Sequence, residues 1–349
     1  MTPERTDGII RLGLDQSLFT AAVILAAEGR RIVLHQSYGT LDGDPTNAAG
    51  TDTLFDLASL TKIIATTPCW MVLAAAEKGI LDEPIIRWFP EAPKDKKNIT
   101  PRLLLAHASG LPHWRPYYLC LSRFDHKIFV RDKILREPLV YGPGDGCLYS
   151  DLGFMLLGFI LEIETGKSLD QVAVEKIFKP LRLEKELIFR PSASARSIAP
   201  TLQGETAGCV HDLNARALGE VSGHAGLFGT AKGVHGVMAE LTAGIGSESG
   251  LFDGETLRMF AERTSYVPDT TRALGFDTPA RENCSSGRFF SRQSLGHTGF
   301  TGTSAWADPT TGIVLVLLTN RAYMGEGDFR IKQFRPLVHD ALMLDLGRT

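Results

Sequence analysis

The chain has 349 residues, of which 44% are hydrophobic and 22% charged, and its formal net charge is −3. This composition is typical of a globular protein and excludes an intrinsically disordered chain. Because the basic residues are spread along the sequence, no nucleic-acid-binding surface is expected. The length indicates one large domain or two interlocked domains.

No targeting or membrane segment is expected. The first seven residues lack the basic region, apolar core and cleavage site of a secretory signal. The longest apolar stretches, such as 154–163, are too short to span a bilayer. The five cysteines form no Cys-x-x-Cys pair and indicate free thiols in a reducing compartment. A cytoplasmic protein is therefore expected, or a periplasmic or extracellular one if a leader has been removed.

The two ends of the chain are predicted to build one sheet. A short helix over 6–15 precedes a strand pair whose hairpin turn lies at Glu28-Gly29, and a helix over 329–346 closes the chain. A second strand pair surrounds the turn 308–312. The predicted strands are 20–27, 30–36, 303–307 and 313–318.

The middle of the chain is predicted to be mainly helical. A long helix from Ser59 to Lys78 ends at Gly79, and another over 152–165 ends at Gly166. Shorter helices are expected at 101–107 and 169–177, and loops at 191–204, 244–254 and 281–288. We therefore predict an α/β domain from 1–57 and 215–349, an inserted helical domain from 58–214, and an active site in the cleft between them.

Ser59-Leu60-Thr61-Lys62 opens the long helix and is the most informative stretch of the sequence. Serine and lysine three positions apart lie on the same helix face. A desolvated lysine can remove the proton of a serine hydroxyl and so activate it as a nucleophile. By itself the pattern is weak, because a capping serine followed by a solvated lysine looks the same.

Two further segments carry side chains suited to the same cleft. Tyr149-Ser150-Asp151 follows a turn and precedes a helix, although a packed tyrosine and a capping aspartate would also fit. His297-Thr298-Gly299-Phe300 leads into a strand, where a glycine lets a substrate backbone lie alongside. An ordinary glycine-containing strand start remains the alternative.

Together, the order and spacing of these segments resemble the serine β-lactamase, penicillin-binding protein and esterase superfamily, closest to its class C β-lactamase-like branch. That family carries Ser-x-x-Lys, Tyr-x-Asn and Lys-Thr-Gly or a variant in this order. The resemblance extends over about residues 21–320. Further matching segments are 103–112 (LLLAHASGLP), 149–154 (YSDLGF), 223–228 (GHAGLF) and 296–303 (GHTGFTGT).

The resemblance implies a two-domain fold with an antiparallel sheet, flanking terminal helices and an inserted helical domain. It also implies covalent catalysis without a metal or organic cofactor. Ser59 would attack a carbonyl carbon while Lys62 and Tyr149 shuttle its proton. The backbone N–H groups of Ser59 and Phe300 would hold the oxyanion, each contributing about 3–4 kcal/mol. Asp151, His297, Thr298, Gly299 and Phe300 would contact the substrate.

Two residues depart from the family pattern. Asp151 replaces the asparagine, and an ionised carboxylate beside Lys62 would raise the pKa of its amine, weaken it as a base and shift that role towards Tyr149. His297 replaces the lysine, and a largely neutral imidazole binds a substrate carboxylate less well. Both changes favour an esterase, or a peptidase of altered preference, over an efficient β-lactamase.

Other signals carry less weight. His224, between two glycines, and Trp114, after a Gly-Leu-Pro loop, are candidates for lining the cleft. The histidine pairs lack the spacing of metal ligands, so no metal site is expected. The segment Glu164 to Ser168 lacks the first glycine of a phosphate-binding loop, and no Gly-x-Ser-x-Gly motif of an α/β-hydrolase is present.

The sequence thus predicts a serine hydrolase that cleaves an ester or amide of a small-molecule acyl substrate, with an esterase favoured. The alternatives are a D-alanyl-D-alanine carboxypeptidase or endopeptidase, a weak class C β-lactamase, or a catalytically silent binding protein of the same fold. The sequence does not fix the oligomeric state.

Overall fold

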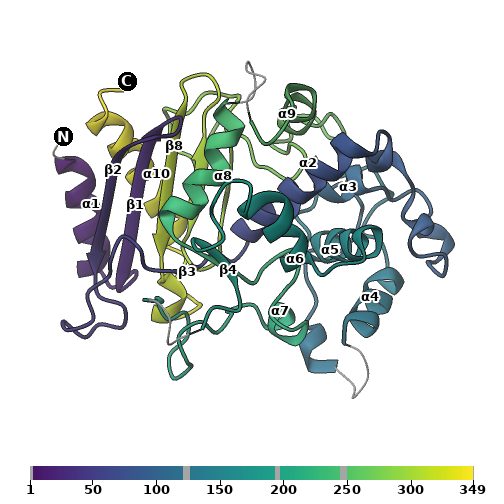
Figure 1. Ribbon diagram of the computed structural model, residues 1–349, viewed down its shortest axis with the longest axis horizontal. Coiled ribbons are helices and arrows are strands. Elements are labelled where there is room, and N and C mark those ends of the chain that lie inside the picture. Colours follow the sequence, from purple (N-terminus) through teal and green to yellow (C-terminus); the bar gives the residue numbers. More distant parts are fainter. Residues whose placement is uncertain (1–2, 121–125, 193–196, 244–249, 349) are drawn as a thin grey trace.

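The two ends of the chain meet in one five-stranded antiparallel sheet of order β2-β1-β8-β7-β6 (Figure 1). The computed structural model describes residues 3–120, 126–192, 197–243 and 250–348. The strands are β1 (Ala21–Glu28), β2 (Arg31–Gly39), β6 (Leu295–Thr298), β7 (Ser304–Ala307) and β8 (Ile313–Thr319). Both predicted strand pairs are therefore present, with Gly29 in the β1–β2 turn at φ +56°.

Both faces of this sheet are buried, so its central strands are apolar throughout. Alternate residues of β1 and β8 point to opposite sides, as a strand requires. Ile24 and Leu315 pack towards α1 (Glu4–Asp15) and α10 (Ile331–Asp345). Their neighbours on the strands pack into the main core, towards α8 (Ala231–Ala243). The sheet is thus a layer between two terminal helices and one internal helix (Figure 1).

The remaining helices form a second group on the other side of α8 (Figure 1). Its centre is α5 (Asp151–Thr165), which is buried from Leu152 to Leu161 and therefore lacks a polar face over most of its length. Gly166 ends it in the left-handed conformation at φ +65°. Around it lie α2 (Thr67–Ala76), α3 (Pro101–Leu105), α4 (His126–Arg136), α6 (Leu169–Ala173), α7 (Leu213–Ala217) and α9 (Gly254–Ala261).

A small antiparallel sheet, β3-β5-β4, connects the two groups. Its strands are β3 (Phe55–Asp56), β5 (Leu227–Gly229) and β4 (Leu187–Phe189). β3 directly precedes Ser59, and β5 directly follows the segment that contains His224. The sheet therefore fixes two candidate site segments relative to each other. The division into domains at 57/58 and 214/215 stays a prediction.

Several predicted boundaries were wrong in detail. The helix expected over 59–78 consists of a π-helical turn, Lys62–Thr66, followed by α2, and the helix expected over 169–177 becomes π-helical at Val174–Phe178. A π-turn is common at functional sites and is not visible in side-chain periodicity. Helix α9 begins at Gly254, the last residue of the loop expected over 244–254. Parts of the loops predicted at 191–204 and 244–254 lie outside the described residues.

Within the described ranges, no helix is long and apolar enough to cross a membrane.

Asn320, which follows β8, connects this strand to the start of β1 and so links the N-terminal and C-terminal parts of the large sheet. Its side-chain oxygen accepts hydrogen bonds from the N–H groups of Thr20 (3.1 Å) and Ala21 (2.9 Å). Its amide nitrogen donates to the hydroxyl of Thr20 (2.7 Å) and the carbonyl of Leu41 (2.9 Å). The Asn320 side chain is buried, and its bond with the Ala21 N–H is fully buried, while the other three are partly buried.

Asn320→Ala is expected to lower the free energy of unfolding by about 3 kcal/mol, because it leaves buried donors and acceptors unpaired. Urea denaturation measures the change. The matched control is Asn47→Ala, since the exposed amide of Asn47 bonds only the exposed Asp42 carboxylate and should cost less than about 1 kcal/mol. Equal losses in the two variants would contradict the role of Asn320.

Candidate active site

Ser59 sits on a tight turn between β3 and the π-turn. The preceding residue, Ala58, has φ +47°, an uncommon value for a residue other than glycine. The buried Asp56 carboxylate holds this turn by accepting a hydrogen bond from the Ala58 N–H at 2.8 Å. Its other oxygen accepts from the His211 N–H at 2.7 Å. These bonds fix the backbone so that the Ser59 side chain lines the cleft.

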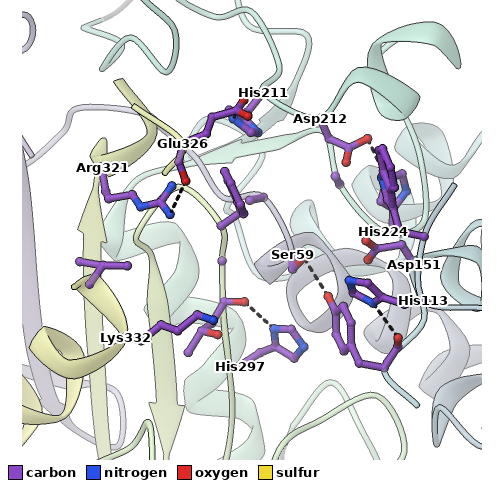
Figure 2. Close-up of a pocket in the computed structure, with 18 of the residues that line it drawn as sticks. Ser59, His113, Asp151, His211, Asp212, His224, His297, Arg321, Glu326 and Lys332 are labelled. Atoms are coloured by element: carbon purple, nitrogen blue, oxygen red, sulfur yellow. Dashed lines mark hydrogen bonds and ion pairs between the residues drawn. The ribbon is translucent and has the colours of Figure 1, made fainter. Parts of the chain in front are cut away.

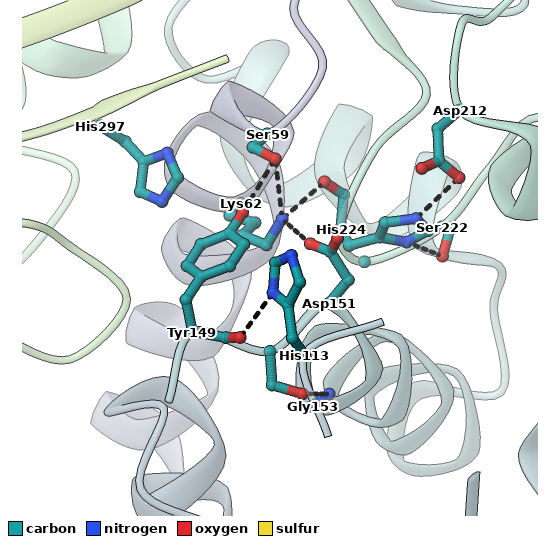
Figure 3. A network of polar contacts seen from close by, with 12 residues as sticks. Ser59, Lys62, His113, Tyr149, Asp151, Gly153, Asp212, Ser222, His224 and His297 are labelled. Carbon is teal, nitrogen blue, oxygen red and sulfur yellow. Dashed lines mark hydrogen bonds and ion pairs between the residues drawn. The ribbon is translucent and has the colours of Figure 1, made fainter. Parts of the chain in front are cut away.

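Lys62 is fully buried, and its amine contacts three oxygen atoms (Figure 3). Nζ lies 3.1 Å from Ser59 Oγ, 2.7 Å from Asp151 Oδ1 and 3.1 Å from the His224 carbonyl oxygen. Burial by itself lowers the pKa of this amine. The Asp151 carboxylate and the Tyr149 phenol outweigh burial and raise the pKa of Lys62 above its usual value. The predicted effect of Asp151 on the lysine is thus present.

Tyr149 completes the contacts to the serine by donating its phenolic hydroxyl to Ser59 Oγ at 2.9 Å. Burial and the Asp151 carboxylate raise the pKa of this phenol, so Tyr149 is neutral at ordinary pH. The turn that carries it is held by the side chain of the next residue, Ser150, which donates to the Pro112 carbonyl and caps α5 by accepting from the Gly153 N–H.

His224 lies beside the Lys62 amine, and its ring is held from two sides (Figure 3). Its ring nitrogens contact Ser222 Oγ at 2.8 Å and Asp212 Oδ1 at 2.9 Å. The ring is almost fully buried, although the residue also lines the cleft. The contact with Lys62 is made by the backbone carbonyl of His224, which accepts from the amine, rather than by the imidazole.

His297 lies on β6, at the edge of the large sheet, with its ring 5.7 Å from that of Tyr149. Nδ1 contacts the Thr298 carbonyl oxygen at 2.7 Å, while the buried Nε2 has no partner among the described residues. Burial, together with the nearby cations Lys62 and Arg272, lowers the pKa of His297 well below its usual value. The imidazole is therefore neutral near pH 7, as predicted from its type.

The turn after β6 is attached to the Ser59 turn by two buried hydroxyls. Thr301 donates to the Asp56 carbonyl at 2.7 Å, and Thr303 donates to the Leu57 carbonyl at 3.2 Å. Gly299 has no room for a side chain, because a Cβ atom there would lie 2.1 Å from Thr303 Oγ1. Ser59 and the segment 298–300 thus lie side by side although they are far apart in sequence.

Arg335 of α10 holds the same turn from the other side. Its buried guanidinium donates to the carbonyl oxygens of Gly299 and, at 3.4 Å, of Gly302. Burial lowers the pKa of Arg335 to about 9, so the group remains cationic at neutral pH. The turn between β6 and β7 is therefore held by both the small sheet and the C-terminal helix.

One cleft with aromatic and cationic walls is lined by Ser59, Tyr149, Asp151, His224, His297 and Arg335, among others (Figure 2). Trp114, 37% exposed, and Phe300, 41% exposed, both line it. The Arg321 guanidinium lies 4.6 Å from the centre of the Phe300 ring. All ten site residues predicted from the sequence lie in or beside this cleft: Ser59, Lys62, Trp114, Tyr149, Asp151, His224, His297, Thr298, Gly299 and Phe300.

Sequence reasoning missed several cleft residues. Asp212 and Arg272 come from segments with no recognisable motif, and Arg321 and Arg335 lie beyond the last matching segment. The only available signal for Asp212 was its position at the N-cap of α7, which does not predict a cleft. In the part of the chain that the structure describes, no group of three or more His, Cys, Asp or Glu side chains is arranged to hold a metal ion.

Comparison with known proteins agrees with this architecture. The Beta-lactamase family model matches residues 7–339. A protein of Escherichia coli strain K12 named "Putative D-alanyl-D-alanine carboxypeptidase" is 33% identical, covering 87% of this chain and 79% of its own. A protein of the same name from Salmonella agona is 32% identical, covering 91% and 82%.

Solved structures share the fold at lower identity. "EstCE1, a hydrolase with promiscuous acyltransferase activity" has a TM-score of 0.78 at 23% identity, with 97% of each chain covered. A penicillin-binding protein homologue from Caulobacter crescentus has a TM-score of 0.73 at 20% identity, again with 97% of each chain covered. These likenesses concern the fold alone.

Fold and relatives together define a serine hydrolase that works through an acyl-enzyme. The family match spans most of the sequence, and the chain belongs to the β-lactamase family.

The neutral state of His297 predicts a pH effect on stability. Because the pKa of the folded state is depressed, the unfolded chain binds more protons below about pH 6.5, and stability falls as the pH is lowered through that window. His297→Gln should reduce this slope by up to about 1.4 kcal/mol per pH unit. Urea unfolding at pH 7, 6 and 5 measures it, and an unchanged slope would contradict a neutral, buried ring.

Proposed function

We propose that Ser59 is the nucleophile that forms the acyl-enzyme and that Lys62 and Tyr149 move its proton. The observation that carries the proposal is the environment of Ser59 Oγ, which lies 3.1 Å from the Lys62 amine and 2.9 Å from the Tyr149 hydroxyl at the wall of the cleft. A serine, a potential base and a third orienting group within hydrogen-bonding distance form the arrangement that activates a nucleophile.

The oxyanion of the tetrahedral intermediate is held, in this proposal, by the backbone N–H groups of Ser59 and Phe300. Neither group donates a backbone hydrogen bond to another described residue. The two segments are fixed against each other by the hydroxyls of Thr301 and Thr303, so both donors are in place before the substrate arrives. Preorganised donors of this kind contribute about 3–4 kcal/mol each.

The remaining steps follow from the same groups. Collapse of the tetrahedral intermediate breaks the bond to the leaving group, which takes a proton from the neutral phenol of Tyr149. Water then attacks the acyl carbon and gives one proton back to the tyrosine. The bond to Ser59 Oγ breaks, Oγ takes back through Lys62 the proton that it lost, and the acid is released. Each proton removed is returned, as a general acid–base pair requires.

Esters of small acyl groups are the first substrate class we propose. The neutral His297 gives no positive charge at the position where the family has a lysine, which weakens recognition of a carboxylate there. Trp114 and Phe300 supply apolar surface to the cleft, which suits an uncharged acyl or alcohol group. Thr298 and Gly299 form the strand edge along which the substrate would lie.

A D-alanyl-D-alanine carboxypeptidase is the second candidate, favoured by the names of the curated relatives. Its substrate carries a terminal carboxylate, and the cleft is lined by the cations Arg272, Arg321 and Lys332. Arg272 is paired with Asp277. This candidate therefore requires the pair to open or another cation to bind the carboxylate.

A cytoplasmic location is proposed on the state of the cysteines. All five are free, and none of them pairs with another. Free thiols persist in a reducing compartment. Cell fractionation distinguishes this location from the periplasm, where a peptidase acting on the cell wall would be needed.

Ser59→Ala is expected to abolish covalent labelling by a fluorophosphonate and to lower ester turnover by at least about 10³-fold, because the attacking oxygen is lost. Gel fluorescence and mass spectrometry of the labelled protein measure the effect. The control is Ser37→Ala on β2, at the opposite edge of the sheet from β6, which should label like the parent. Labelling that survives in Ser59→Ala would remove this residue from the mechanism.

One purified sample tested on three substrates separates the candidate activities. Turnover of p-nitrophenyl butyrate with little release of D-alanine from a peptide ending in D-alanyl-D-alanine is expected for the esterase. The reverse ratio of kcat/KM values would favour the carboxypeptidase. Hydrolysis of a chromogenic cephalosporin is expected to be slow, because His297 supplies no charge for its carboxylate.

A further inference from the structure

We infer that Asp151 is the final acceptor of the Ser59 proton, with Lys62 as the group that passes it on. This inference rests on the proposed function, in which Ser59 is the nucleophile. It adds a role for a side chain that would otherwise only bind substrate or hold the lysine in place.

The arrangement around Lys62 Nζ carries the inference. Two of its three contacts, the Asp151 carboxylate oxygen at 2.7 Å and the His224 carbonyl oxygen at 3.1 Å, can only accept hydrogen bonds. A protonated amine has three N–H groups, and the third then points at Ser59 Oγ, 3.1 Å away. In this state the amine has no free lone pair with which to act as a base.

Loss of one proton by the amine changes this contact in a definite way. The N–H that bonds Asp151 is the one that gives up its proton, and rotation about the Cε–Nζ bond then turns the lone pair towards Ser59 Oγ. The two remaining N–H groups bond the Asp151 carboxylic acid and the His224 carbonyl. The amine is fully buried, so the proton must first go to a group that touches it. Of the three contacts only the Asp151 carboxylate can hold a proton, because a peptide carbonyl is not basic and Ser59 is itself the donor.

The step balances within the site. As Ser59 Oγ bonds to the substrate carbonyl carbon, the Oγ–H bond breaks and its proton moves to Lys62. One N–H bond of Lys62 has already broken before this, and its proton has bonded to Asp151 Oδ1. The carbonyl π electrons move to the oxygen held by the backbone donors. Lys62 ends as it began, and the carboxylate becomes a carboxylic acid.

Other ionisable groups near the pair are less suited to this role. Tyr149 donates to Ser59 Oγ, and its neutral phenol has a raised pKa but no free negative charge. The Asp212 carboxylate contacts the His224 ring and does not touch the amine. The remaining ionisable neighbours of the pair and of Tyr149 are His107, His113, Arg272 and His297.

An asparagine at position 151 would alter the chemistry, because an amide can donate to or accept from the amine but cannot take up its proton. With asparagine, Lys62 would have to release its proton to solvent before each attack. The fraction of neutral amine falls about tenfold for each pH unit below its pKa. Asp151 removes that requirement by keeping the proton inside the site.

The test compares the pH dependence of fluorophosphonate labelling in the parent and in Asp151→Asn, from pH 5.5 to 9. Fluoride leaves without needing a proton, so the rate reports removal of the serine proton alone. At pH values below the alkaline plateau of the variant, the ratio of the parent rate to the variant rate is expected to rise about tenfold for each unit of decreasing pH. Asp15→Asn, at the exposed end of α1, makes the same charge change at a residue that does not line the cleft and should follow the parent.

The opposite dependence would overturn the inference. If Asp151 only stabilises the ammonium, its removal makes the lysine a better base, and the ratio falls as the pH is lowered. A ratio independent of pH also contradicts proton acceptance by Asp151. Ser59→Ala is labelled in parallel, and survival of its labelling would instead overturn the proposed function.

A second measurement uses only the parent protein, in case Asp151→Asn does not fold. The labelling rate of the parent is measured from pH 6.5 to 9. It is expected to change by less than about twofold, because the proton stays within the Lys62–Asp151 pair and no net proton is lost before the attack. A rate that rises about tenfold for each pH unit would mean that Lys62 gives its proton to solvent, and it would contradict the relay.

Discussion

The attachment of the β6–β7 turn to the Ser59 turn is the constraint on which the site depends. The hydroxyls of Thr301 and Thr303 donate hydrogen bonds to the carbonyls of Asp56 and Leu57. Both threonines are fully buried, so their hydroxyls cannot bond bulk water instead. Buried hydroxyls without partners are costly, so these bonds also select one relative position of the two segments. The large sheet and the helical group are thereby held in one relative position, and this position determines the shape of the cleft.

Burial of a charged amine is the second constraint. Lys62 has no exposed surface, and its charge is tolerated because the Asp151 carboxylate lies beside it. Removing one member of a buried ion pair leaves the other uncompensated, which makes such a pair sensitive to substitution. The same low-polarity surroundings strengthen every hydrogen bond to Ser59 Oγ. The stability and the reactivity of this part of the site therefore depend on the same three side chains, Ser59, Lys62 and Asp151.

Much of this arrangement could be predicted from the sequence, and the exceptions have physical reasons. The strands of β1 and β8 were visible as apolar runs between turn residues, and the motif segments around Ser59, Tyr149 and His297 identified the cleft. The π-turn at Lys62 was not predictable from helical periodicity, because it depends on contacts with distant segments. Asp212 and Arg335 reach the site only through tertiary packing, so no local pattern marks them.

The contact between Arg335 and the Gly299 carbonyl has an electronic consequence. This carbonyl belongs to the same peptide unit as the Phe300 N–H, so a guanidinium bound at its oxygen withdraws electron density through the conjugated amide. Hydrogen bonds in series polarise one another in this way, and the N–H at the far end becomes more acidic. Arg335 of the C-terminal helix thus takes part in the electrostatics of the cleft through one planar group, the peptide unit between Gly299 and Phe300.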